Sequence, residues 1–337
     1  MRSAFSPELV NGPFGDPALY VDFRFEPRAL LVDLGNLDIL APKKILRISD
    51  AFVSHTHMDH FCGFDRLLRI CLGRDTSLRL YGPPGFIAQV EHKLAAYTWN
   101  LVERYPGDFV MEVWEIDAGG QAQGRRLRCR EHFQPEPLPT RQLSGGVLLD
   151  EPGFRVRAAL LDHGIPCLGF AIEEKAHVNV WKNRLAELGL PVGPWLKPLK
   201  DAVMRGAPDD TPVRAWWRDH EGEHERHFTV GALKGDVLRL VPGETIGYVT
   251  DVAFQDDNRR SIVDLARGAT RLFIECAFLD EDAGLAAARW HLTARQAGAI
   301  ARECGAEFVI PFHFSPRYEG REMELRAELD AAHGAGA

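Results

Sequence analysis

The spacing of apolar and polar residues predicts a succession of strands followed by alternating strands and helices. Residues 18–34 alternate in polarity around a Glu-Pro-Arg turn, which predicts a β-hairpin. Apolar runs predict further strands at 48–54, 78–81, 109–116, 126–130, 154–161, 168–172, 245–250, 271–276 and 308–312. Helical spacing predicts helices at 65–72, 86–97, 294–303 and 321–332. This mixture suits two sheets with helices outside them.

The segment 174–212 differs in character from the chain around it. It combines a short helical stretch with a Gly/Pro-rich stretch. Between Lys175 and Arg205 it carries six basic residues and two acidic ones. We therefore expect a single domain over 1–337, with 174–212 as an inserted arm that binds substrate.

Composition limits the function classes. Of the 337 residues, 45% are hydrophobic and 26% charged, which is typical of a soluble globular protein. The 40 basic and 48 acidic residues give a net charge of -8, which excludes a generic polycationic nucleic-acid binder but not RNA recognition by a local basic patch. Six cysteines without C-x-x-C spacing, and no signal-like or membrane-spanning apolar run, favour a cytoplasmic protein.

The heptapeptide SHTHMDH at 54–60 carries the strongest chemical signal. It places His55, His57, Asp59 and His60 within six residues, directly after an apolar run. Imidazole nitrogens and carboxylate oxygens together form a ligand set for zinc or manganese. Such density is rare outside metal sites, and two of these side chains can face one ion while the other two face a second.

Four residues cannot complete two metal centres, so distant ligands are required. His163, Asp251 and His313 each close an apolar run that is predicted to be a core strand. An unpaired polar side chain in such a position is costly, and metal ligation removes the cost. Taken singly, each has an alternative as a hydrogen-bonded core histidine or as an aspartate that caps the next turn.

These motifs resemble the signature of the metallo-β-lactamase superfamily. His163, Asp251 and His313 follow the heptapeptide in the order of that superfamily's later ligands. Histidine rather than glutamate at position 57 favours a hydrolase over the di-iron redox branch. The resemblance implies a four-layer αββα sandwich.

Further stretches resemble the ribonuclease Z branch, which processes the 3′ ends of tRNA. These are GPPG at 82–85, DHGIP at 162–166, LPVGP at 190–194, HLT at 291–293 and HFSPRY at 313–318. Two departures mark a divergent member. The family's glycine-rich opening is absent near residues 11–16, and Ile274 stands where the family's His-Glu-Ala-Thr stretch begins with histidine.

The resemblance assigns roles to the candidate residues. His55, His57 and His163 would hold one ion, Asp59, His60 and His313 the other, and Asp251 would bridge them. Zinc is expected, although manganese and iron accept the same ligands. A water shared by the two ions would ionise near neutral pH and attack the phosphodiester.

Acid–base roles follow from the same resemblance. Asp59 would orient or deprotonate the attacking water, and His291 would protonate the leaving ribose oxygen. Asp162 and Glu275 would support ligand histidines. The alternative for His291 is an ordinary histidine before a helix that Thr293 caps.

Substrate contacts are expected in the arm and in the closing motif. They comprise Lys182, Arg184, Gly193, Pro194, Lys197, Lys200, Ser315 and Arg317. Trp181 and Trp195 interleave with the arm's basic residues, an arrangement that suits a grip on the tRNA elbow. The alternative is a solvated excursion with packing tryptophans. The resemblance also implies a homodimer in which one subunit's arm serves the other's site.

Three functional hypotheses remain open. The first is removal of 3′ trailers from precursor tRNA by a two-metal phosphodiesterase. The second is a hydrolase of the same fold for a cyclic nucleotide or another small phosphodiester. The third is a non-catalytic binding protein, which the complete seven-ligand set argues against. Segment 214–227 is expected to be a solvated charged helix, with metal binding by His220, His224 and His227 at helical spacing as the alternative.

Overall fold

The computed structural model describes residues 4–220 and 222–334, which belong to two compact units. Unit 1 combines 1–173 with 244–337, and unit 2 spans Glu174–Gly243. The expected insertion over 174–212 therefore begins where unit 2 begins, but the compact unit continues for a further 31 residues.

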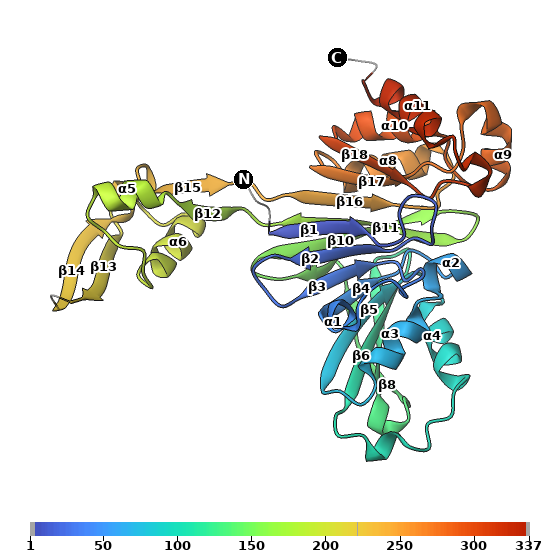
Figure 1. Cartoon of the computed structure of the whole chain (residues 1–337), viewed down its shortest axis with the longest axis horizontal. Helices are drawn as coiled ribbons and strands as arrows, with labels where there is room; N and C mark the ends of the chain where they lie inside the picture. Colours follow the sequence, from blue (N-terminus) through green and yellow to red (C-terminus); the bar gives the residue numbers. More distant parts are fainter. Residues whose placement is uncertain (1–3, 221, 335–337) are drawn as a thin grey trace. The chain divides into compact units, whose positions relative to one another are not determined.

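The first sheet of unit 1 contains eight strands in chain order (Figure 1). They are β1 (Phe5–Leu9), β2 (Leu19–Phe23), β3 (Ala29–Val32), β4 (Ile48–Phe52), β5 (Thr76–Gly82), β6 (Phe109–Ile116), β7 (Gln121–Arg128) and β8 (Pro135–Gln142). The predicted hairpin at 18–34 is confirmed, because β2 and β3 pair antiparallel with Leu19 opposite Val32. Strands β3, β4, β5 and β6 run parallel to one another.

The second sheet of unit 1 has the order β18-β17-β16-β11-β10-β9. Its strands are β9 (Val147–Asp150), β10 (Phe154–Asp162), β11 (Pro166–Glu174), β16 (Thr245–Val249), β17 (Arg271–Glu275) and β18 (Phe308–Phe312). Strands β16, β17 and β18 are parallel, so their carboxyl ends lie at one edge of the sheet.

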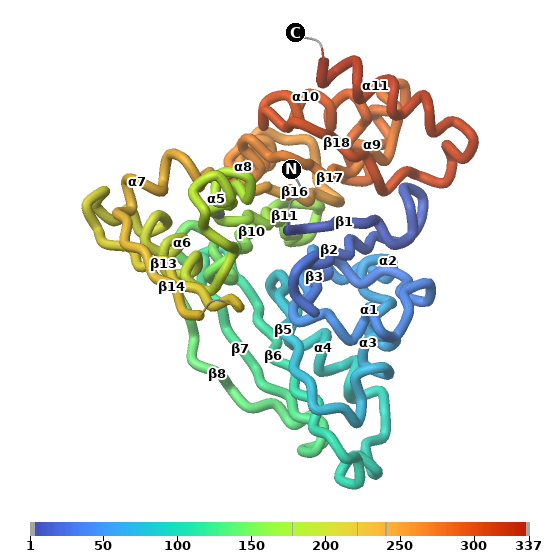
Figure 2. Tube along the Cα trace, turned by 60° about the vertical axis from the view of Figure 1, so that its left-hand side comes forward, coloured from blue at the N-terminus to red at the C-terminus, as the bar shows by residue number. Residues whose placement is uncertain are grey.

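Helices cover the outer faces of both sheets, as Figures 1 and 2 show. The first group is α1 (Pro42–Ile45), α2 (Met58–Phe61), α3 (Phe64–Cys71) and α4 (Phe86–Ala95). The second is α8 (Asp256–Leu265), α9 (Ala283–Ala288), α10 (Ala294–Cys304) and α11 (Glu322–Gly334). Short 3₁₀ turns lie at Val102–Arg104, Cys129–Glu131, Asp280–Asp282 and Pro316–Tyr318.

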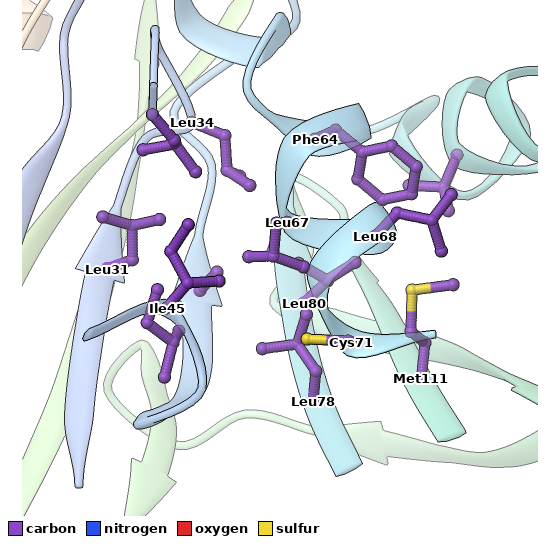
Figure 3. Close-up of a cluster of buried hydrophobic side chains, with 14 of the residues drawn as sticks. Leu31, Leu34, Ile45, Phe64, Leu67, Leu68, Cys71, Leu78, Leu80 and Met111 are labelled. Carbon is purple, nitrogen blue, oxygen red and sulfur yellow. The ribbon is translucent and has the colours of Figure 1, made fainter. Parts of the chain in front are cut away.

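Three apolar clusters hold the layers of unit 1 together. One lies between the first sheet and its helices, a second between the two sheets, and a third between the second sheet and its helices. Helix α3 shows the pattern, since its buried face of Phe64, Leu67 and Leu68 packs against Leu80 and Met111 of the first sheet (Figure 3). The four-layer αββα architecture expected from the resemblance is confirmed.

Unit 2 has its own small core. It contains β12 (His177–Val180), β15 (Leu238–Val241), β13 (Pro212–Asp219), β14 (Gly222–Thr229), α5 (Lys182–Glu187), α6 (Leu196–Met204) and α7 (Val230–Lys234). Trp195 is completely buried there, and its indole N–H donates to the carbonyl of Pro191 at 3.0 Å. Trp195 is therefore a core residue rather than a surface contact, while Trp181 is half-exposed.

The prediction of a helix over 214–227 is wrong. The segment forms an antiparallel hairpin of β13 and β14, with Val213 and Ala215 buried on one side. Successive side chains of a strand point to opposite faces, so His224 and His227 face opposite ways and do not form a metal site. His224 instead bonds the carboxylate of Asp219 at 2.9 Å, and His227 pairs with Glu225.

The edge strands of the unit 1 sheets either contain proline or are short. Three of the four contain proline: Pro7 in β1, Pro135, Pro137 and Pro139 in β8, and Pro311 in β18. The fourth edge strand, β9, has only four residues.

Across residues 4–220 and 222–334, none of the helices has the length and apolar character needed to cross a membrane.

Candidate metal centre

Strand ends of unit 1 bring the predicted ligands together. His55 and His57 follow β4, and Asp59 and His60 lie on the adjoining helix α2. His163, Asp251 and His313 follow β10, β16 and β18. Potential ligand atoms of the first group, His55, His57, His163 and Asp251, lie within 4.8 Å of one another, as do those of the second group, Asp59, His60 and His313.

Asp251 lies between these two groups. Its Oδ2 atom is 3.6 Å from His55 Nε2 and 3.5 Å from His163 Nε2. Its Oδ1 atom is 3.5 Å from His60 Nε2 and 3.1 Å from His313 Nδ1. The carboxylate thus directs one oxygen to each histidine group, the geometry that a bridging ligand requires.

The donor set fits divalent metal ions. Nε2 of His55, Nε2 of His60 and Nδ1 of His313 are buried and have no hydrogen-bond partner within the described chain. A buried, unsatisfied polar atom costs about 1–3 kcal/mol, and a metal ion satisfies several such atoms at once. Nitrogen with carboxylate oxygen is the chemistry that zinc, manganese and iron accept, so the cluster fits a divalent metal site.

The protonation states of several ligands suit this role. Burial lowers the pKa of His55 to about 2 and also lowers the pKa of His57, which keeps both rings in the neutral form that binds metal. Burial alone would raise the pKa of Asp251, but the neighbouring His313 and His60 hold it well below its usual value. Asp251 is therefore a carboxylate.

Asp33, which the sequence analysis did not identify, orients the second group. This fully buried carboxylate lies 3.0 Å from His60 Nδ1 and accepts hydrogen bonds from the Tyr248 hydroxyl at 2.8 Å and from both the backbone N–H and the hydroxyl of Ser54. A hydrogen bond from the distal nitrogen fixes the tautomer and direction of a ligand histidine. Asp33 follows β3, but it lies inside the hairpin predicted at 18–34, so no predicted strand end marked it in the sequence.

Three residues at this site adopt backbone angles that are unusual for residues with a Cβ. Of the five described non-glycine residues with positive φ, Asp33, Trp290 and His313 lie at the cluster. Such strain persists where the surrounding structure holds it and is common at functional sites. The carbonyl oxygen of Trp290 lies 2.8 Å from Nδ1 of His163 and orients this ring, whose Nε2 faces Asp251.

His291 faces the cluster and is paired with Glu275. The fully buried Glu275 directs Oε2 to His291 Nδ1 at 3.0 Å, while its Oε1 accepts the Val252 N–H at 2.7 Å. Burial alone would lower the pKa of His291, but the Glu275 carboxylate raises it to about 9. Thr293 caps α10 with a capping box, as the alternative interpretation predicted. The centre of the His291 ring nevertheless lies 4.9 Å from the centre of the His163 ring.

Asp162 has a different role from the expected one. Its carboxylate accepts the Gly164 N–H at 2.8 Å and bonds the side chain of Gln255 at 2.9 Å. It therefore shapes the loop that carries His163, and none of its described hydrogen bonds goes to a ligand ring.

A cavity of about 270 Å³ opens at the second group. Asp59, His291, His313 and Ser315 line it, together with Arg289. Arg317, predicted with Ser315 as a substrate contact, does not line the cavity. Its Nη1 atom lies 3.5 Å from Oδ2 of Asp282.

The six predicted arm residues lie in unit 2. Lys182, Arg184 and Lys197 are exposed, and Lys200 is half-buried. Gly193 and Pro194 line a groove of about 500 Å³ next to the half-exposed Trp216 of β13.

Comparison with known proteins gives a consistent result. No family model matches the chain. The chain is 31% identical over 332 residues to the ribonuclease Z of Deinococcus radiodurans, covering 97% of this chain and 94% of the relative. Among solved structures, the short form of human tRNase Z has a TM-score of 0.54 at 19% identity, with 94% and 92% of the two chains covered. A metallo-β-lactamase fold protein of Bacillus subtilis gives 0.53 at 18%, with 98% and 94% covered.

Proposed function

The chain belongs to the ribonuclease Z family, and from that membership we propose that it removes 3′ trailers from precursor tRNA as a two-metal phosphodiesterase. The observation that carries the proposal is the Asp251 carboxylate, which directs one oxygen to His55 and His163 and the other to His60 and His313. This arrangement fits two ions held side by side, which can stabilise both the attacking and the leaving oxygen of an in-line phosphoryl displacement.

The proposed ligands form the two groups that the distances between their ligand atoms define. His55, His57 and His163 would hold one zinc ion, Asp59, His60 and His313 the other, and Asp251 both. Bound zinc would supply Lewis-acid stabilisation of the charge that develops on the phosphodiester. The protein's part is to fix these side chains, and Asp33, Ser54 and the carbonyl of Trp290 do so.

Two side chains carry the proton transfers in this proposal. Asp59 lines the cavity with Oδ2 3.4 Å from His313 Nε2, where it can orient the attacking water and accept its proton. His291 would donate a proton to the leaving ribose oxygen, and the buried carboxylate of Glu275 holds the ring in position. The product would be a tRNA cut after the discriminator base with a 3′-hydroxyl end.

The charge distribution supports an RNA-binding role for unit 2. It contains eleven basic and ten acidic residues, whereas the rest of the chain has 29 basic and 38 acidic. Phosphate neutralisation supplies much of RNA affinity, so the unit without a net negative charge is the better place for it. Exposed Lys182 and Lys197 are the proposed phosphate contacts.

Zinc as the metal, a homodimeric state and a cytoplasmic location complete the proposal. The nitrogen-rich ligand set supports zinc, and the homodimer and the location rest on the resemblance to the family.

The decisive experiment is cleavage of a 3′-extended precursor tRNA by the zinc-loaded protein, with the product ends mapped. We expect a single cut after the discriminator base. Asp59→Ala should lose nearly all activity, while Asp65→Ala, a control on the neighbouring helix α3 outside the cluster, should retain it. An uncut precursor alongside brisk hydrolysis of a small phosphodiester would refute the tRNA substrate in favour of a small molecule.

A further inference from the structure

Trp290 occupies a turn position that normally belongs to glycine. It follows α9 with φ of 62°, and the turn closes through the His291 N–H, which donates to the carbonyl of Ala286 at 3.0 Å. A left-handed residue after a helix is usually glycine, because a Cβ strains that conformation. The backbone of the turn therefore gains nothing from a tryptophan side chain.

The metal cluster also requires only the backbone of this residue. The carbonyl oxygen of Trp290 holds His163 Nδ1 at 2.8 Å, and glycine would present the same carbonyl. The use of the indole ring must lie elsewhere.

The indole lies against Gly164, next to the ligand His163. A Cβ added to Gly164 would come within 3.0 Å of Cε2 and 3.1 Å of Nε1 of Trp290, so one side of the ring covers this glycine. The side chain nevertheless remains 46% exposed. A large aromatic ring is thus fixed beside a candidate metal ligand and open to solvent.

Two other exposed apolar side chains belong to the adjoining loops. Ile165 follows Gly164 and is 39% exposed. Phe254 is 49% exposed and follows Ala253, whose N–H donates to the carbonyl of Asp162. Exposed apolar side chains that gather on one face mark binding surfaces, and these three belong to loops that carry or adjoin the ligand His163.

We propose that Trp290 is a stacking platform for the base of a nucleotide that flanks the scissile phosphodiester. The inference rests on the proposed function, because an RNA substrate is what brings a base to this position. Unstacked bases of single-stranded RNA bind aromatic faces, and an exposed indole offers such a face without charge. Trp290 is a substrate-positioning residue, since the reacting atoms lie at the cluster itself.

The test uses Trp290→Gly, which keeps the carbonyl for His163 and relieves the strained backbone. The measured quantity is the ratio of kcat/KM for precursor tRNA to kcat/KM for a small chromogenic phosphodiester. Loss of one base–aromatic stack should lower this ratio by roughly 5- to 150-fold. Trp290→Phe, which keeps an aromatic face, should retain most of it.

A coupling experiment then identifies the stacked nucleotide. Precursors with an abasic residue on one side or the other of the cut are compared in wild type and Trp290→Gly. One of the two abasic substitutions should lower wild-type kcat/KM and have no further effect in the variant.

The outcomes separate the two proposals. An unchanged ratio in Trp290→Gly overturns the stacking role, whether both activities are retained or both fall equally. A wild-type protein that leaves every precursor uncut but hydrolyses the small phosphodiester overturns the proposed function and this inference with it.

Discussion

Replacing Asp33 by asparagine should weaken metal binding at the second group. Asp33 is fully buried and receives contacts from His60 Nδ1, the Tyr248 hydroxyl, and the N–H and hydroxyl of Ser54. Oδ2 faces His60, Tyr248 and the Ser54 hydroxyl, and Oδ1 accepts the Ser54 N–H, so an asparagine keeps three of these contacts at best and turns its NH₂ group toward the fourth donor. His60 then loses the charged partner that fixes its tautomer and ring direction.

The structure sets the size of the effect. At least one of the four contacts is lost, and the other three lose the charge of their acceptor. Breaking a buried charged interaction costs about 3–5 kcal/mol, so the free energy of unfolding should fall by about that amount. Removal of the partner of a ligand histidine typically lowers metal affinity by roughly 10- to 100-fold. The assays are urea unfolding and metal competition with a chromogenic chelator.

Asp50→Asn is the matched control. Asp50 is equally buried on the neighbouring strand β4, but its partners are Arg28, Arg79 and Ser49, outside the cluster. It should destabilise the fold to a similar extent and leave metal affinity unchanged. Wild-type metal affinity in Asp33→Asn, or equal loss of affinity in both variants, would refute the assignment of Asp33.

Four further outcomes are expected. Hydrogen bonds from Arg28 lower the pKa of Glu151, so its contribution to stability is present above pH about 4.5 and lost as pH falls through the lowered pKa; the difference in unfolding free energy between wild type and Glu151→Gln should shrink over that acid range. Trp195→Ala should cost about 3–5 kcal/mol by leaving a cavity in unit 2, with faster hydrogen exchange confined to 174–243 and a lower rate of precursor cleavage. Arg289 is the one Lys or Arg among the described residues that line the cavity, so Arg289→Ala should reduce the slope of log affinity for precursor against log salt by about 1, whereas Arg289→Lys should preserve it. Removal of metal with a chelator should lower the melting temperature in calorimetry, and added zinc should restore it, because the buried nitrogens of His55, His60 and His313 lose their partner; an identical melting curve would contradict the metal-site assignment.

The metal cluster was predictable because its members share a local pattern. Four of them lie in one heptapeptide, and His163, Asp251 and His313 each follow an apolar strand. Asp33 shows the limit of that pattern. A single aspartate after a strand becomes informative only when β3 and β4 are known to be parallel neighbours, which places it beside Ser54.

The missed elements have weak local signals. Strand β8 is almost wholly exposed, and prolines occupy three of its eight positions, so no alternation of polarity marks it. Helix α8 buries three of its ten side chains, and five of the ten are charged. Unit 2 ends at Gly243 because β15 pairs with β12, which lies some sixty residues earlier in the chain. Composition does not reveal such a contact.

The hairpin of unit 2 was assigned wrongly for a related reason. Charged residues and histidines recur in 214–227 at spacings that also suit a helix. The decisive positions were Val213 and Ala215, whose alternate burial indicates a strand, but two small apolar residues are a weak signal beside so many charges.

The prolines of the edge strands have a consequence for self-association. In β1, the Val10 N–H donates to the Ala18 carbonyl, so even-numbered residues of this strand face β2. Pro7 is odd-numbered and directs its nitrogen, which carries no hydrogen, toward the open edge.

The same holds at the other end of this sheet. The Asp117 N–H donates to the carbonyl of Gln121, so odd-numbered residues of β7 face β6 and even-numbered ones face β8. Pro137 lies opposite the odd-numbered Arg125 and therefore directs its nitrogen outward.

The second sheet repeats the arrangement in β18. The Phe312 carbonyl accepts the Cys276 N–H, so Phe312 faces inward and Pro311 faces the open edge. At each of these three edges, a strand from another molecule would find a backbone N–H donor missing. It could not extend either sheet there into an amyloid-like or domain-swapped ladder. Two copies of this chain that meet at these edges must therefore recognise each other through side chains.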